Sequence, residues 1–181
     1  MSKMKIRSIK EVARYVGISL LSKGMSVSPL KLQKILYYVQ SWYMVMFGRE
    51  NTLFDETPQA WINGPVYPSV FREYKDLVEG MCDHLHAKDV GCESEVLLAE
   101  EAERIANELE FDNDEIECID SVVTLYGAKT QNQLIFMTHS EKPWAEQREG
   151  LSPFDRSQNP ISLDTMHDFY KARYDRNHKN S

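Results

Sequence analysis

The sequence predicts a mainly α-helical fold: a compact multi-helix domain around a long central helix, with at most a small β-hairpin or edge strand. Three observations support this fold class. Apolar residues recur at three- and four-residue steps over most of the chain. One segment of helical length is apolar on nearly all of its faces. Only the stretch between Asn51 and Pro68 departs from helical periodicity. We expect residues 1–150 to form the main domain, and residues 151–181 to form a C-terminal helix and polar tail packed on it or trailing from it.

Two helices are predicted at the start of the chain. Residues 8–22 form an amphipathic helix that Ser8 caps and that ends before Gly24. The next helix has the clearest signals: Ser28 at the cap position, Pro29 at the first helical position and Gly48 after its last turn. Because this second helix is apolar nearly all round, we expect it at the centre of the domain with neighbours on several sides.

The period changes after the second helix. Residues 58–62 are predicted to form a short extended segment, which Asn63 and Gly64 follow. An Asn-Gly pair is typical of a tight hairpin. However, Pro65 and Pro68 remove two backbone donors from any returning strand, so the sequence favours a loop or an edge strand over a regular hairpin.

The rest of the chain is predicted to be helical, with two irregular stretches. Thr130 and Gln133 fit a capping box, and Ser162 fits the cap of a last helix. The tail from Asp175 onward is polar and is expected to fray. Further helices are predicted over residues 70–77, 97–109, 116–127, 130–137 and 162–170, with irregular chain over residues 80–94 and 143–160.

Charge is segregated along the chain. The 181 residues have a net charge of -7, which argues against general affinity for nucleic acid. Residues 1–50 hold nine Lys/Arg and two Asp/Glu, whereas residues 93–120 hold twelve Asp/Glu and one Arg; residues 171–181 are basic again. Such blocks either pair with one another or steer a charged partner, and the sequence leaves both interpretations open.

The same composition bears on location. No apolar run approaches the roughly 18 residues of a membrane span, and the basic N-terminus is not followed by a signal-peptide core. Three cysteines form an odd and sparse set, which favours reduced thiols. We therefore expect a cytoplasmic protein with no membrane partner and no direct nucleic-acid binding.

The most metal-like cluster is Cys82, His84, His86 and Cys92. Thiolates and imidazoles can bind zinc, but structural zinc sites space paired ligands by two to four residues, and only one residue separates Cys82 from His84. A polar surface loop is the favoured interpretation. Phosphate-binding glycine motifs and nucleophile-elbow motifs are missing from the sequence. We expect no catalytic residue, no cofactor and no metal ion, and keep a metal- or thiol-dependent hydrolase using this cluster as the alternative function.

The chain is rich in tyrosine and tryptophan, which supply large contact areas with a polar end. Most of these side chains are expected to form the core. The corner from Asn63 to Val66, between Trp61 and Tyr67, is different because a rigid turn beside two aromatic residues either presents an anchor to a partner or only reverses the chain.

Four segments together resemble the antitoxin SocA-like, or Panacea, domain family, which is also described as the phage-associated GepA proteins. The first is similar to the family's signature helix: Leu32-Gln-Lys-Ile-Leu-Tyr-Tyr-Val-Gln-Ser-Trp-Tyr43. The others follow in the family's order: Leu53-Phe-Asp-Glu56, Ala60-Trp-Ile-Asn-Gly-Pro-Val66 and Thr138-His-Ser-Glu-Lys-Pro-Trp144. The resemblance runs from about residue 9 to residue 145. Val39 and Ser41 depart from it, since the family commonly has Ala and Gly there.

This resemblance implies a non-enzymatic antitoxin of a bacterial or prophage toxin–antitoxin pair, which neutralises a toxin encoded beside it by direct binding. A proteolytic adaptor that delivers a partner to a protease is a further alternative, and a homo-oligomer is compatible with the sequence. A basic toxin would suit the acidic stretch. The residues expected to bind the partner include two assumed to be exposed on the signature helix, Gln33 and Tyr37, together with Trp61, Asn63, Gly64, Pro65, Val66, Tyr67, His139 and Trp144.

Overall fold

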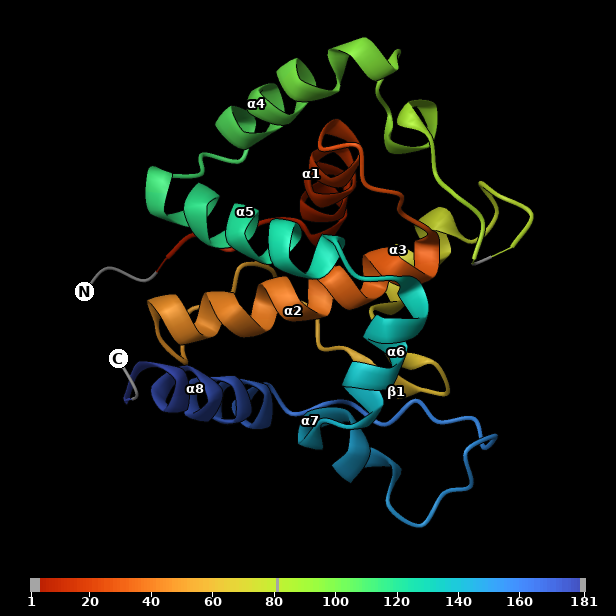
Figure 1. Ribbon diagram of the computed structural model, residues 1–181, viewed down its shortest axis with the longest axis vertical. Coiled ribbons are helices and arrows are strands. Elements are labelled where there is room, and N and C mark those ends of the chain that lie inside the picture. The colour runs from red at the N-terminus through yellow and green to blue at the C-terminus, as the bar shows by residue number, and fades with distance from the viewer. Residues whose placement is uncertain (1–3, 81, 180–181) are drawn as a thin grey trace.

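The computed structural model describes residues 4–80 and 82–179, and it confirms the mainly α-helical prediction (Figure 1). The described part of the chain forms eight α-helices and a single two-stranded antiparallel hairpin. The elements are α1 (Ile9–Ser22), α2 (Pro29–Phe47), β1 (Gln59–Trp61), β2 (Gly64–Val66), α3 (Pro68–Tyr74), α4 (Leu98–Glu108), α5 (Asn113–Gly127), α6 (Gln131–His139), α7 (Lys142–Ala145) and α8 (Leu163–Lys179).

Helix α2 is the central element, as predicted. Ser28 Oγ accepts the Lys31 N–H at 3.0 Å, Pro29 occupies the first turn, and Gly48 follows the last turn with a φ of +107°. Helices α1 and α5 contact α2 from one side and α8 contacts it from the other (Figure 1). Every residue from Pro29 to Ser41 is buried. The helix therefore forms the middle of the core, and its neighbours cover all of its faces over these turns.

Two buried glutamines of α2 satisfy the backbone of extended segments beside it. Gln33 accepts the Tyr67 N–H at 2.8 Å and donates to the Tyr67 carbonyl oxygen at 3.4 Å. Gln40 accepts the Leu53 N–H and donates to the Phe54 carbonyl oxygen, both at 2.9 Å. Buried backbone groups need such partners. The two side-chain amides therefore make the hydrogen bonds that a neighbouring strand would otherwise make.

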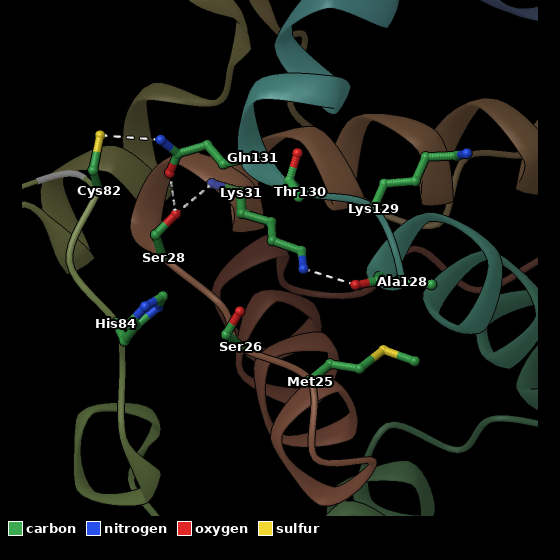
Figure 2. A pocket seen from close by; sticks show the side chains of 11 residues that line it. Met25, Ser26, Ser28, Lys31, Cys82, His84, Ala128, Lys129, Thr130 and Gln131 are labelled. Atoms are coloured by element: carbon green, nitrogen blue, oxygen red, sulfur yellow. Dashed lines mark hydrogen bonds between the residues drawn. The ribbon is translucent and has the colours of Figure 1, made fainter.

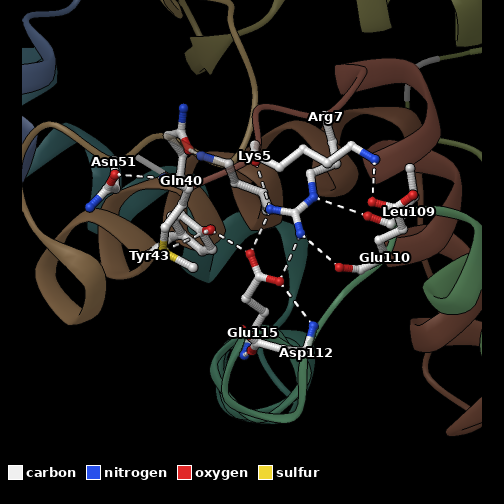
Figure 3. Close-up of polar contacts among 11 residues, drawn as sticks. Lys5, Arg7, Gln40, Tyr43, Asn51, Leu109, Glu110, Asp112 and Glu115 are labelled. Carbon is white, nitrogen blue, oxygen red and sulfur yellow. Dashed lines mark hydrogen bonds and ion pairs between the residues drawn. The ribbon is translucent and has the colours of Figure 1, made fainter. Parts of the chain in front are cut away.

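A buried ion pair fixes the N-terminal segment to the start of α5 (Figure 3). The Arg7 guanidinium donates to both carboxylate oxygens of Glu115, at 2.6 and 2.8 Å, and the Tyr43 hydroxyl donates to the same carboxylate at 2.6 Å. The other guanidinium N–H groups donate to the carbonyl oxygens of Lys5, Leu109 and Glu110. Since all of these groups are hydrogen-bonded, the pair tolerates burial; removing one partner would leave an uncompensated charge.

Four ion pairs connect the basic N-terminal block to the acidic block: Lys5–Glu110, Arg7–Glu115, Arg14–Glu101 and Lys23–Asp120. The interpretation that the blocks pair with one another is therefore correct for these residues.

Local signals at the helix starts agree with the structure in two cases and differ in one. Thr130 and Gln133 form the predicted capping box at the start of α6. Ser162 Oγ accepts the Thr165 N–H at 3.2 Å at the start of α8. Ser8 lies at the cap position of α1, but its side chain makes no capping hydrogen bond.

Two sequence predictions about irregular chain are wrong. Residues 59–66 form the small hairpin that the fold class allowed, where the prolines favoured a loop or an edge strand over a regular hairpin. Pro65 is tolerated because it pairs with Ala60 at a position where the two residues do not exchange backbone hydrogen bonds. The Ala60 N–H donates to the Asn159 carbonyl oxygen instead, so the pairing of the two strands does not require an N–H from Pro65. The predicted frayed tail is helical as far as Lys179, the last residue of α8. Residues 180 and 181 lie outside the described residues.

Candidate partner-binding site

The turn of the hairpin is in close contact with α2. Gly64 has a φ of +105°, which favours glycine, and a Cβ at this position would lie 2.6 Å from Lys34 Cε and 2.8 Å from Thr138 Oγ1. A larger residue at position 64 would therefore push the hairpin away from α2 and α6.

Lys34 holds the hairpin from within the core. Its side chain is fully buried, and Nζ donates to the Pro65 carbonyl oxygen at 3.1 Å. Burial lowers the pKa of Lys34 from 10.5 to about 7, because the charged ammonium loses its hydration. In the folded protein the amine therefore releases its proton near neutral pH.

The segment after α6 clamps the other strand. Trp144 Nε1 donates to the Trp61 carbonyl oxygen at 2.9 Å, and the Arg148 guanidinium donates to the Ala60 carbonyl oxygen at 3.0 Å and lies over the Trp144 ring. The His139 ring stacks on Trp144 with centroids 4.0 Å apart. Burial, and next the charge of Lys34, lower the pKa of His139. We call these contacts around residues 34, 64 and 144 the hairpin brace.

The predicted binding residues differ widely in accessibility. Asn63 is exposed, and Trp61, His139 and Trp144 are partly exposed, whereas the segment from Gly64 to Tyr67 is buried. The assumption that Gln33 and Tyr37 are exposed is wrong, since their exposed fractions are 1% and 0%. Gln33 bonds the backbone of Tyr67, and the Tyr37 hydroxyl accepts a hydrogen bond from Tyr170 of α8. Neither side chain is placed to touch a partner.

Beside the hairpin lies an open pocket of about 540 Å³, which we call the hairpin pocket. Buried Leu30 and Val66 line it together with the rings of Trp61 and Phe71, which meet edge to face with centroids 4.9 Å apart. The remaining lining residues are Ile62, Asn63, Cys82, Arg156, Ser157 and Gln158. The predicted binding residues include neither Phe71 nor Arg156. Helical periodicity placed Phe71 on a helix, but no local pattern connects Arg156 with residues almost a hundred positions earlier.

The structure does not assemble the Cys/His cluster into a metal centre. Cys92 is buried and its thiol contacts the Ser94 carbonyl oxygen at 3.2 Å, whereas Cys82 is exposed and accepts a hydrogen bond from Gln131 at 3.1 Å. Among the described residues, no group of three or more His, Cys, Asp or Glu could hold a metal ion. The hydrolase alternative therefore has no support in this geometry.

Fold and site together define a mainly helical domain that holds a short, braced hairpin next to an open, partly apolar pocket. Residues 32–145 match the family model of the antitoxin SocA-like, Panacea domain, and the chain belongs to this family. The resemblance seen in the four sequence segments is thereby confirmed. No curated protein and no solved structure matches the chain significantly. Among the described residues, no helix has both the length and the apolar character that crossing a membrane requires.

Proposed function

We propose that this protein is the antitoxin of a bacterial or prophage toxin–antitoxin pair and that it neutralises its cognate toxin by direct protein–protein binding. The observation that supports this most is that two of the family-like segments contact the hairpin formed by a third. Trp61 and Asn63 of this hairpin stay at least partly exposed beside the hairpin pocket. Trp61 and Arg156 line this pocket, and tryptophan and arginine are typical of the residues that contribute most of the binding energy at protein interfaces.

Two groups of residues serve this function in different ways. Trp61, Asn63, His139 and Trp144 contact the toxin, because parts of their side chains are accessible. The buried residues Gln33, Gly64, Pro65 and Tyr67 act indirectly by holding the hairpin in one conformation before binding. Buried Val66 lines the hairpin pocket, and Tyr37 is bonded to Tyr170 of α8. A hairpin fixed in advance lowers the ordering cost of association. Inhibition then follows from covering the active surface of the toxin or from stabilising an inactive form of it.

Co-expression with the product of the adjacent open reading frame tests this proposal. We expect growth rescue and a complex that co-purifies with this protein. Trp61→Ala should weaken rescue, whereas Val96→Ala, which truncates an exposed residue next to α4, should not. A harmless neighbour that never associates with the chain would reject the antitoxin function. Turnover of a substrate by the isolated chain, lost in Cys82→Ala, would favour the thiol enzyme instead.

The adaptor alternative and the assembly state have separate readouts. An adaptor needs its protease, so rescue should disappear in a strain without that protease. Light scattering of the isolated protein measures whether it forms a homo-oligomer. We also propose that residues 1–150 hold most of the binding function, to which Arg156 adds the rim of the hairpin pocket, and that the C-terminal helix stabilises them, since Met166 and Tyr170 of α8 are buried in the core. The cytoplasm is the proposed location.

A further inference from the structure

A second pocket, of about 450 Å³, opens where α2 begins, α5 ends and α6 begins (Figure 2). Lys31, Lys129 and His84 line it, together with hydroxyl groups such as that of Ser26. None of the described residues that line it is an aspartate or glutamate, although the chain has 28 acidic residues and a net charge of -7. We call it the cationic pocket.

Hydrogen bonds order the walls of the cationic pocket. Lys31 Nζ donates to the Gly127 carbonyl oxygen at 2.7 Å. This hydrogen bond satisfies a backbone carbonyl group at the end of α5. The Ser28 hydroxyl donates to Gln131 Oε1 at 2.5 Å, and Gln131 Nε2 donates to Cys82 Sγ at 3.1 Å (Figure 2). The walls are therefore held in place before any ligand arrives, and their surplus charge is positive.

Cys82 lies between the two pockets, since it lines both the cationic pocket and the hairpin pocket. Arg156 gives the hairpin pocket a positive rim, and the described lining of that pocket also has no carboxylate. An apolar depression and a positively charged depression thus adjoin each other on a protein whose net charge is -7. This pairing is complementary to a chain segment that has an apolar side chain close to negative charges.

We propose that the two pockets form one groove for an extended segment of the partner protein, in which an apolar side chain enters the hairpin pocket and nearby Asp or Glu side chains enter the cationic pocket. The apolar side chain packs against Trp61 and Phe71. The carboxylates meet Lys129 and His84, with Lys31 behind them. The inference rests on the proposed function only in taking the partner to be the toxin.

A protein segment suits this groove better than a nucleic acid does. A long polyanion would approach the exposed carboxylates of a chain with net charge -7 as well as the groove. A short segment with a few acidic residues avoids most of that repulsion. Its apolar side chain also fills the depression between Leu30, Val66 and the two rings, which phosphates would leave empty.

Selection of random linear peptides displayed on phage against the immobilised full-length protein tests the proposal without the toxin. We expect enriched peptides to contain a large apolar residue within a few positions of Asp or Glu. Fluorescence anisotropy with the best peptide should show affinity at least about tenfold weaker for Trp61→Ala and for Lys129→Glu. Lys88→Glu, a charge reversal of an exposed lysine outside both pockets, is the matched control and should bind like the parent protein. Far-UV circular dichroism checks that each variant is folded.

Cys82 offers an independent position marker. It is exposed, whereas Cys92 is buried and Cys118 is half-buried, so iodoacetamide should modify Cys82 first. The bound peptide should slow that modification several-fold, and peptide mass mapping identifies the cysteine. An unchanged modification rate at saturating peptide would place the peptide elsewhere and overturn the proposal.

The remaining outcomes also decide. Enrichment of basic peptides, no enrichment above background, or equal affinity for Trp61→Ala, Lys129→Glu and the parent protein would each reject the groove. So would an RNA oligonucleotide that binds with the same dependence on these residues. Failure of the antitoxin function gives a different result. If a peptide binds in the groove but the product of the adjacent gene is harmless, the groove proposal stands and the antitoxin function is rejected. If the double variant with Lys129→Glu and Trp61→Ala still rescues growth fully, the antitoxin function stands and the groove proposal is rejected.

Discussion

Lys34 should make the stability of this protein rise with pH above neutrality. Its amine is buried and donates to the Pro65 carbonyl oxygen, and burial lowers its pKa from 10.5 to about 7. Between these two values the unfolded chain keeps a proton that the folded chain has released. The free energy of unfolding therefore increases with pH, by about 1.4 kcal/mol per pH unit.

The substitution Lys34→Met removes the amine and retains an apolar stem. At pH 7.5 it relieves a deprotonation cost of about 4 kcal/mol, and it leaves the Pro65 carbonyl oxygen unpaired at a cost of about 1–3 kcal/mol. The variant should therefore be more stable than the parent protein at pH 7.5, by about 1–3 kcal/mol. Near pH 10 the relief falls below about 1 kcal/mol, so the variant becomes the less stable protein. The order of stability should reverse between about pH 8 and pH 10.

Urea unfolding of both proteins at half-unit steps from pH 7.5 to 10 measures this difference. Burial raises the pKa of Cys118 to about 12, so the parent protein also loses stability above pH 9, where the unfolded thiol releases its proton. That loss is common to both proteins and cancels in the difference. If the free energies of unfolding of the two proteins change in parallel with pH, Lys34 is not a buried amine with a lowered pKa. A variant that is less stable at every pH would show that the hydrogen bond to Pro65 outweighs the desolvation of the lysine.

Three further substitutions have expected effects on urea unfolding at pH 7.5. Gly64→Ala should cost about 2–4 kcal/mol, because its φ is positive and its Cβ would lie 2.6 Å from Lys34 Cε; a loss below 0.5 kcal/mol, on the order of measurement error, would contradict the close packing. Arg7→Leu should cost about 3–5 kcal/mol by stranding Glu115, and adding Glu115→Leu should restore much of that loss; a double variant as unstable as the single one would argue against the ion pair. Asp112→Ala should cost about 1 kcal/mol, since its side chain caps α5; no change would mean that Glu115 alone maintains the cap.

The sequence predicts those parts of the fold that depend on neighbouring residues. The cap at Ser28, the proline after it and the glycine at position 48 define α2, and Thr130 with Gln133 starts α6. These signals act within one turn, where chain connectivity brings the groups together whatever the rest of the protein does. Local chemistry is therefore sufficient for these helix boundaries.

Two features that depend on distant residues differ from the prediction. Gln33 is polar and lies on a helix surface, which by itself favours exposure, but its amide pairs with the Tyr67 backbone thirty-four positions later. Pro65 lacks a donor, which argues against a strand only if that donor faces the partner strand. Here Ala60 bonds to Asn159 on its other side instead. Which side of a strand faces its partner is a property of the assembled fold and cannot be read from a single proline.

The residues of the hairpin brace differ from the residues that charge the two pockets. The signature positions Lys34, Gly64 and Trp144 contact the hairpin from inside, and a change at any of them alters how it is held. Lys129 and Arg156, which line the two pockets, lie outside the four family-like segments. Their exchange leaves the brace intact. A domain built in this way can keep its fold while the charge of its pockets changes, so a change of partner at the proposed groove would not require a change of scaffold.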